Sequence, residues 1–331
     1  MSRSPIRLIV ILALGLFITA FATEAQPPLT RATIGVLSNA TPGSPGLAAL
    51  IDVFRQELRE RGWAEGQNLT IEYRYAEAKA ERLPALAAEL VGLQVDVIVA
   101  FSAPAIHAAK QATTTVPIVF ETLGDAVVMG FVSNLARPGG NITGVTGFSP
   151  ELGGKWLELV QQVIPGIHHV AFLINPANPA TPSTVQATAS AAQALGVELH
   201  VVEVHDPSEL DAAFVAMRGR QVAALIIPPD SLFLRQGRHI AALASAAQLP
   251  TISGMQPIVE EGGLISYGTT LVDNWRRAAV YVDRILRGAM PGDLSVERPT
   301  TFELLINLKT AKTLGLTIPP TLLFQADKVI Q

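Results

Sequence analysis

Along most of this chain, short apolar runs alternate with longer segments in which apolar residues recur every three or four positions. The run Thr33–Leu37 predicts a strand, and the apolar positions of residues 47–58 fall on one face of a helix. Gly62 follows where a left-handed C-cap is expected. Residues 69–75 then alternate apolar and polar side chains, which is typical of a strand with one exposed face. A strand–helix–strand unit is therefore predicted at the start of the folded chain.

The alternation continues beyond a breaker at residues 137–141, Arg-Pro-Gly-Gly-Asn. Further strands are predicted at residues 95–100, 116–120, 170–174, 198–204, 223–227 and 250–253, and further helices at residues 81–91, 156–163, 181–195 and 234–247 and after Ser102 and Asp206. Strands that alternate with helices of this length form right-handed βαβ units with parallel sheets. Two such series predict an α/β protein of two similar, Rossmann-like lobes.

The N-terminal segment has the pattern of a secretory signal peptide. Two arginines precede the apolar run Leu8–Phe21, and small residues follow before a proline-rich start. The run is shorter than the roughly 20 apolar residues that a membrane-spanning helix needs. We expect cleavage after Ala25, with Ala22 as the second choice, and an uncleaved anchor is the alternative. The mature chain is then an exported, soluble protein without stable membrane insertion.

Composition supports a large packed core. Of the 331 residues, 49% are hydrophobic and only 16% are charged, so aliphatic side chains can cover parallel sheets on both faces. The net charge of −4 gives no reason to expect a nucleic-acid partner. Cysteine is absent, so neither disulfides nor a lipid-modified cysteine after the signal peptide is available. We expect a freely diffusing monomer.

Polar residues gather where the predicted strands end. Because ligands of open α/β sheets bind at the carboxyl ends of the strands, these loops from two lobes predict a cleft with polar groups on either side. Each loop also leads into a helix N-terminus, which suits a carboxylate. Helix capping alone is an alternative role for every one of these residues. The candidate ligand-binding residues are Ser38, Asn39, Ser102, Ala103 (through its backbone N–H) and Asp125 in the first lobe, and Asn175, Asp230, Ser253 and Tyr267 in the second.

Several segments carry a family resemblance that extends in order over nearly all of the mature chain. They are "VDVIVAFSAPA", "VPIVFETLGDAVVMGFVSNLARPGGNITG", "LINPANP", "GGLISYG", "RRAAVYVDRILRGAMPGDLSVERPTTFELLINLKTAKTLGLTIPP" and "ADKVI". The chain thereby resembles the substrate-binding proteins of ABC transporters with the type I periplasmic-binding fold, some of which take aromatic amino acids. One departure is Gly124-Asp125-Ala126, where the family usually has Gly-Asp-Pro.

The resemblance implies two lobes joined by three crossovers, at residues 141–148, at the strand 263–267 and at residues 291–300. Lobe one is then expected to hold residues 30–145 and 265–290, and lobe two residues 146–264 and 291–331. Gly144, Gly147 and Gly268 are the candidate hinges, since hinges are a few residues at element ends.

The resemblance also implies a function without a cofactor. The protein is expected to capture a small molecule in the periplasm, such as an amino acid or related carboxylate, and to deliver it to an ABC permease and its ATPase. A periplasmic sensor that reports ligand occupancy to a membrane receptor is the main alternative. Asp125 or Asp230 can hold a ligand ammonium, and we expect Asp230→Ala to weaken binding without changing the melting temperature.

An exported enzyme is the weaker alternative, because catalytic and metal motifs are not evident. Gly43-Ser44-Pro45-Gly46 lacks the spacing of a dinucleotide-binding turn, and no G-x-S-x-G elbow is present. His168 and His169 are adjacent, and His200 and His205 are predicted to point to opposite faces of a strand. The histidine spacing therefore predicts no metal site.

Overall fold

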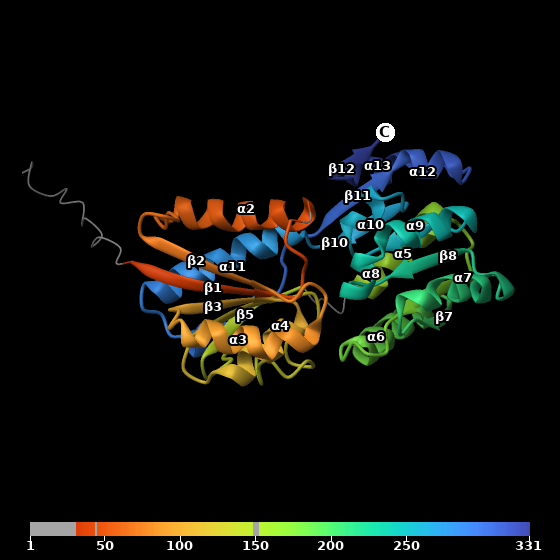
Figure 1. The fold of residues 1–331 in the computed structure, drawn as a ribbon. Coiled ribbons are helices and arrows are strands. Elements are labelled where there is room, and N and C mark those ends of the chain that lie inside the picture. Colours follow the sequence, from red (N-terminus) through yellow and green to blue (C-terminus); the bar gives the residue numbers. More distant parts are fainter. Residues whose placement is uncertain (1–30, 44, 148–151) are drawn as a thin grey trace, which may run out of the picture.

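The computed structural model describes residues 31–43, 45–147 and 152–331. The expected signal peptide, with its cleavage sites at Ala22 and Ala25, lies outside the described residues. Within them the chain forms two α/β lobes that lie side by side (Figure 1). Each lobe is built on one sheet, as the alternating pattern predicts, and the expectation of a two-lobe α/β fold is confirmed.

The first lobe contains a five-stranded parallel sheet of order β2-β1-β3-β4-β5. Its strands are β1 (Ala32–Ser38), β2 (Leu69–Tyr75), β3 (Val97–Phe101), β4 (Ile118–Thr122) and β5 (Ile142–Thr146). Its helices are α2 (Pro45–Glu60), α3 (Leu83–Gly92), α4 (Ala103–Ala112) and α11 (Leu271–Leu286), with short 3₁₀ turns η1 (Ala80–Arg82) and η3 (Pro291–Asp293).

Helices cover both faces of this sheet. Ile34, Val36 and Val99 pack against α2 and α11, whereas Leu37 and Ile98 pack against α3 and α4. Alternate residues of a strand point to opposite faces, so a strand buried on both sides must be apolar throughout. That requirement explains the unbroken apolar runs. Gly62 has φ +93° at the end of α2, the left-handed conformation expected of it.

The second lobe contains a seven-stranded sheet of order β12-β11-β10-β9-β8-β6-β7. Its strands are β6 (His169–Ile174), β7 (Glu198–Glu203), β8 (Ala224–Ile227), β9 (Thr251–Ser253), β10 (Ile265–Gly268), β11 (Glu303–Asn307) and β12 (Lys328–Ile330), and β10 and β11 are antiparallel. Its helices are α5 (Leu152–Val163), α6 (Thr181–Ala194), α7 (Leu210–Gly219) after η2 (Pro207–Glu209), α8 (Ser231–Arg235), α9 (Gly237–Ala246), α10 (Gln256–Glu260), α12 (Leu308–Thr313) and α13 (Pro320–Gln325).

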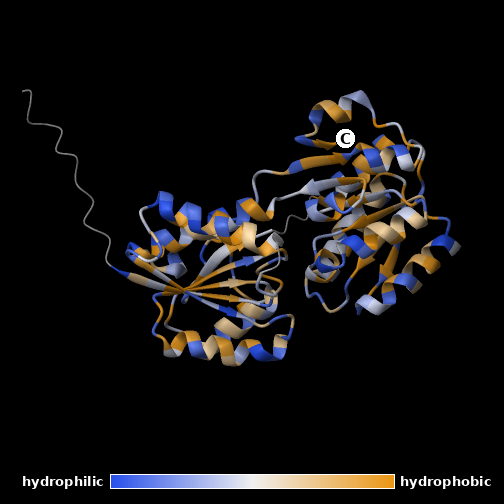
Figure 2. Cartoon of the chain, turned by 45° about the horizontal axis from the view of Figure 1, so that its top comes forward, coloured by the Kyte–Doolittle hydropathy of each residue, from blue (hydrophilic) through white to orange (hydrophobic). Residues whose placement is uncertain are grey.

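Two apolar clusters fill the second lobe, one on each face of its sheet. Phe172 and Ile226 pack with α5 and the C-terminal helices, whereas Leu173 and Leu225 pack with helices α7 to α9. Hydrophobic residues run along the central strands, and hydrophilic stretches recur on the outer helices and loops (Figure 2). No helix among the described residues is long and apolar enough to cross a membrane.

The chain passes between the lobes three times, but not everywhere at the expected residues. Strand β10 pairs with β9 and β11 in the second sheet, so residues 265–268 belong to lobe two and the crossover comes before α11. Residues 291–297 stay with lobe one, because Glu297 forms a bridge with Val145 beside β5. The boundaries expected at 265 and 291 therefore lie near 269 and 298. The lobe boundaries depend on which strands pair through their backbones, and the spacing of apolar residues does not reveal which sheet a strand joins.

Candidate functional site

A hollow lies between the two lobes at the carboxyl ends of their strands. The first lobe contributes the loop after β4, with Leu123 and Gly124, and the connecting residue Gly147. The second lobe contributes the apolar walls and most of the polar groups. Its lining residues are Leu152, Gly153, Trp156, Phe172, Ile174, Asn175, Asn178, Ala180, Thr181, Thr184, Pro228, Pro229, Asp230 and Phe233.

The lobes touch each other at the edge of this hollow. Leu123 of the first lobe packs against the apolar cluster beside α8 in the second. Ala180, just before α6, packs in turn against the first-lobe cluster that contains Ala126 and Met129. These reciprocal contacts place the loops that follow β4 and β6 next to each other. A molecule in the hollow is therefore bounded by both lobes.

Asp230 is the centre of the polar cluster in the second lobe. Its side chain is 5% exposed and caps α8 by accepting a hydrogen bond from the Leu232 backbone N–H at 2.7 Å. It also accepts from Asn178 Nδ2 at 2.7 Å and, at 3.3 Å, from Asn175 Nδ2. Asn175 and Asp230 thus come together as candidate residues. Because the carboxylate is also a cap, Asp230→Ala is expected to lower the melting temperature, contrary to the expectation from the sequence.

Asn178 is a pocket residue that the sequence reasoning missed. It stands in the same loop as Asn175, between β6 and α6, and donates the shortest side-chain hydrogen bond to Asp230. The sequence did contain a signal for Asn178, because this second asparagine lies in the same loop after a predicted strand as Asn175. Trp156 also lines the hollow, and its indole N–H donates to the Tyr267 carbonyl at 2.7 Å.

Ser38, Asn39 and Ser102 lie together at the carboxyl edge of the first sheet. Ser38 pairs in register with Phe101, so Asn39 and Ser102 are neighbours at the ends of adjacent strands. Ser38 Oγ accepts a hydrogen bond from the Ala40 backbone N–H at 3.2 Å. Asn39 Oδ1 and Ser102 Oγ are both buried and have no hydrogen-bond partner among the described residues. Buried polar atoms are nearly always paired, so these two oxygens stand out.

Ser102 also has an unusual backbone. Its φ of +88° and ψ of 149° lie in a region that side-chain-bearing residues rarely occupy. Such a conformation costs about 1–3 kcal/mol and is concentrated at ligand sites. The residue immediately precedes α4, where Ala103 begins the helix and Ser102 Oγ makes no capping hydrogen bond. The hydroxyl and the N-terminus of α4 are thus both available to an anionic group.

Asp125, Ser253 and Tyr267 make internal contacts instead. Asp125 Oδ1 accepts from the backbone N–H groups of the second and third residues after it, at 2.8 and 3.1 Å, and so fixes a turn. Ser253 Oγ accepts from the Met255 N–H at 3.0 Å. The Tyr267 ring stacks on Phe302 with centroids 5.8 Å apart. Among the described residues, these three do not line the hollow, and neither do Ser38, Asn39, Ser102 and Ala103.

The candidate hinge glycines occupy different positions. Gly147 lines the hollow where the first crossover begins, and Gly268 ends β10 at the second. Gly144 lies inside β5, where it pairs with Phe120. A Cβ atom there would be 2.1 Å from the Phe120 carbonyl oxygen. Gly144 therefore allows two strands to approach, and its place inside a strand does not match the expected position of a hinge.

A buried carboxyl group stands behind the first-lobe edge. Glu121, near the end of β4, is 5% exposed and accepts a hydrogen bond from Asn274 Nδ2 of α11 at 3.1 Å. Burial raises the pKa of Glu121 to about 7, against the opposing effect of that hydrogen bond. The Glu121 carbonyl accepts from the Ser102 backbone N–H at 3.3 Å. Glu121 thus supports the Ser102 loop from beneath.

This chain is similar to substrate-binding proteins in the comparison of family models, and it has relatives among curated proteins and solved structures. The family model "ABC transporter substrate binding protein" matches residues 40–330. A tyrosine-binding protein of Clostridioides difficile (strain R20291) is 26% identical over 263 residues, which cover 80% of this chain and 75% of the relative. The relative and this chain are therefore similar over most of their lengths.

Solved structures match both lobes together. The crystal structure of an ABC domain in complex with L-Trp from Streptococcus pneumonia is 25% identical, covers 91% of this chain and 100% of its own, and has a TM-score of 0.84. A conserved domain protein from Vibrio cholerae is 27% identical with the same coverage and a TM-score of 0.83. The similarity therefore extends over both lobes.

Proposed function

Since the chain belongs to the family of ABC transporter substrate binding proteins, whose members bind and do not catalyse, we propose that it captures an amino acid between its lobes. The ligand then passes to a membrane permease and its ATPase. We expect this to happen in the periplasm, after removal of the signal peptide. The candidate residues Asn39, Ser102, Asn175 and Asp230 provide the polar groups, and the walls of the hollow provide the apolar surface.

The observation that carries this proposal is the strained Ser102 with its unpartnered hydroxyl. A ligand carboxylate at the N-terminus of α4 would accept from Ser102 Oγ–H and from the Ala103 N–H, and the helix dipole favours negative charge there. Asn39 Oδ1 is an acceptor just after the neighbouring strand, where a ligand ammonium would satisfy it. Carboxylate acceptor and ammonium donor together describe an amino acid.

The hollow, which Asn39 and Ser102 do not line, has walls that suit an aromatic side chain. Trp156, Phe172 and Phe233 supply its aromatic walls, and all three are at most 2% exposed. Relatives support the same class, because one is named a tyrosine-binding protein and another was solved with L-Trp. We therefore propose tyrosine or tryptophan as the ligand class.

A thermal-shift screen tests the ligand class. L-Tyrosine and L-tryptophan should each raise the melting temperature, and a ligand at a hundredfold excess over its Kd adds about 2.7 kcal/mol to the free energy of unfolding. L-Glutamate and glucose serve as controls for charge and for a polar ligand. Stabilisation by glucose but by neither aromatic amino acid would contradict the proposal.

Two substitutions at Ser102 test the carboxylate contact. Ser102→Ala should raise the Kd about 10- to 100-fold, since a hydrogen bond to a charged group contributes about 1.5–3 kcal/mol. Ser102→Gly should weaken binding similarly while raising the melting temperature of the free protein, because glycine relieves the strained backbone. Calorimetric titration measures the Kd. Ser190→Ala, an exposed serine on α6, is the control, and an unchanged Kd in both Ser102 variants would remove this residue from the site.

A further inference from the structure

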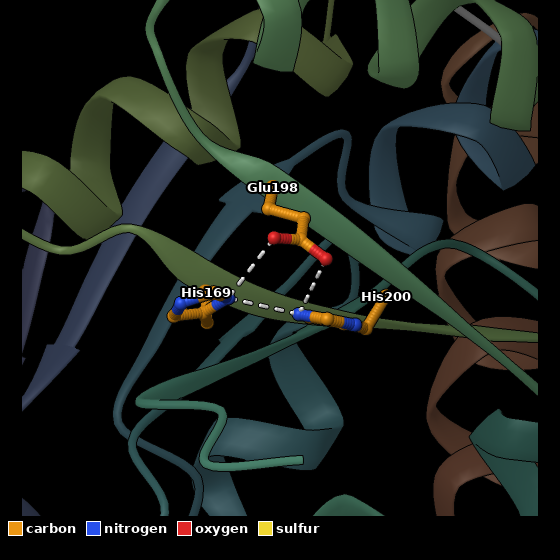
Figure 3. A group of neighbouring side chains, drawn as sticks. All are labelled: His169, Glu198 and His200. Carbon is orange, nitrogen blue, oxygen red and sulfur yellow. Dashed lines mark hydrogen bonds and ion pairs between the residues drawn. The ribbon is translucent and has the colours of Figure 1, made fainter.

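Two histidines and a glutamate meet on the surface of the second lobe. His169 is the first residue of β6, and Glu198 and His200 are the first and third residues of the neighbouring strand β7. The parallel register places His169 directly beside Glu198. Glu198 and His200 are two residues apart on one strand, so their side chains share a face. The Glu198 carboxylate points towards both imidazole rings, which also face each other (Figure 3).

The separations between these side chains match the spacing of ligands around one metal ion. His169 Nδ1 lies 3.1 Å from His200 Nε2. Glu198 Oε2 lies 3.4 Å from His169 Nδ1, and Glu198 Oε1 lies 3.5 Å from His200 Nε2. Zinc binds nitrogen and oxygen donors at about 2.0–2.1 Å in a tetrahedron, which places its ligands about 3.3–3.4 Å apart. One ion therefore fits between the three side chains with little movement.

The donor set selects the kind of metal. Imidazole nitrogens suit zinc, copper and nickel, whereas magnesium and calcium prefer all-oxygen ligands. The side chains of His169, Glu198 and His200 are 45%, 64% and 16% exposed, so an ion can reach them from solvent and water can fill the fourth position. We propose that His169, Glu198 and His200 bind one divalent transition-metal ion, for which Zn²⁺ is the best match.

This metal site is separate from the ligand hollow. His169 begins β6, and Asn175, which lines the hollow, follows the other end of the same strand. Six residues of strand span about 20 Å. Because β7 is the edge strand of the sheet, an ion held by β6 and β7 would fasten that edge. Metal binding is therefore expected to stabilise the second lobe without competing with an amino acid.

The histidine spacing along the sequence predicts no metal site, because spacing does not show which residues become neighbours across two strands. His169 and His200 are far apart in sequence and become neighbours only through the β6–β7 register. Among the described residues, His169, Glu198 and His200 are the group of histidine and acidic side chains that lie close enough together to share one ion. The adjacent pair His168 and His169 contributes a single member to it.

Equilibrium dialysis of the tag-free, metal-free protein against ZnCl₂ tests the proposal. We expect one zinc per chain, a higher melting temperature with zinc, and no comparable uptake of Mg²⁺ or Ca²⁺. His169→Ala and His200→Ala should each raise the Kd for zinc by more than about tenfold, since loss of even an outer-shell partner costs about 10- to 100-fold. Glu198→Gln should weaken binding as well.

His205→Ala is the matched control, because His205 is an exposed histidine whose ring lies beside a single glutamate, Glu203, among the described residues. It should bind zinc as the wild type does. Circular dichroism confirms that each variant folds, and His200→Gln replaces any alanine variant that does not. No zinc uptake by the wild type, or equal uptake by wild type, His169→Ala and His200→Ala, would overturn the proposal and leave a hydrogen-bonded histidine pair.

Discussion

At the residue scale, the clearest physical consequence concerns Glu121, whose burial raises its pKa to about 7. The folded protein therefore holds the proton of the Glu121 carboxyl more tightly than the unfolded chain, where the pKa of this group is 4.5. The contribution to stability is fully present below pH 4.5 and is lost as the pH rises through 7. Each pKa unit corresponds to about 1.4 kcal/mol, so the loss is about 3 kcal/mol.

Glu121→Gln should abolish this pH-dependent loss, because glutamine keeps an acceptor for Asn274 without ionising. The difference in unfolding free energy between variant and wild type should grow in favour of the variant from pH 5 to pH 8. Denaturant unfolding across that range measures it. Glu81→Gln, at an exposed position, is the control, and parallel stability curves for Glu121→Gln and wild type would mean that Glu121 titrates normally.

Individual residues also show where sequence reasoning reaches its limit. Polar residues after strands correctly indicate the sheet edges where the hollow lies, and Asn175 and Asp230 do line it. Asp125 and Ser253 carry the same signal but satisfy nearby backbone groups. A polar side chain after a strand can cap its own loop or face a ligand, and only its hydrogen-bond partners distinguish the two. The strain at Ser102 likewise has no signal in its residue type.

At the element scale, the strands buried on two faces are predictable from sequence because continuous apolar runs leave few alternatives. The short elements are not. The single helix predicted at residues 234–247 is divided into α8 and α9 at Gln236, and strands β5, β11 and β12 were not predicted. Those strands are three to five residues long, too short for an alternation to be distinctive. Their pairing partners, rather than their own sequence, define them.

Helix α11 follows strand β10 of the second lobe but packs against the sheet of the first lobe, which it completes. Trp63 Nε1–H donates to Asp283 Oδ1 at 2.9 Å, and the Trp63 side chain is 1% exposed. Asp283→Ala would leave this indole N–H buried without a partner, which costs about 1–3 kcal/mol. Because Asp283 Oδ1 also accepts from Arg287 Nε at 2.6 Å, chemical denaturation should show a loss of at least that size.

Trp63→Phe keeps the ring and removes the donor, so a double-mutant cycle isolates the hydrogen bond. The double variant should be less destabilised than the sum of the single variants. Asp293→Ala, in the exposed part of η3, is the control. Additive effects of Trp63→Phe and Asp283→Ala would show that the contact does not hold α11 in place.

At the scale of the whole molecule, ligand exchange should depend on separation of the lobes. A ligand that shifts the lobes from about 1% to 99% closed must favour the closed arrangement by about 5.5 kcal/mol. The Ala180 Cβ lies 3.6 Å from the position that a Cβ on Gly124 would take, and the end of the flexible Met129 side chain, 2.4 Å from that position, must move aside. The separation of the two Cβ positions suits a disulfide, and the native chain has no cysteine to compete.

The double variant Gly124→Cys/Ala180→Cys should therefore slow both ligand association and release when oxidised. Reduction should restore the rates, since the lobes can then part at this contact. Stopped-flow fluorescence with L-tryptophan measures them, and either single cysteine variant is the control. Equal rates before and after reduction would mean that ligand enters without the lobes moving apart here.

The return of α11 to the first lobe has a consequence for biosynthesis. The face of the first sheet that carries Ile34 and Val36 stays covered by α2 alone until Trp275, Ala278 and Val282 have left the ribosome. Most of the polypeptide must therefore be made before its N-terminal half can finish folding.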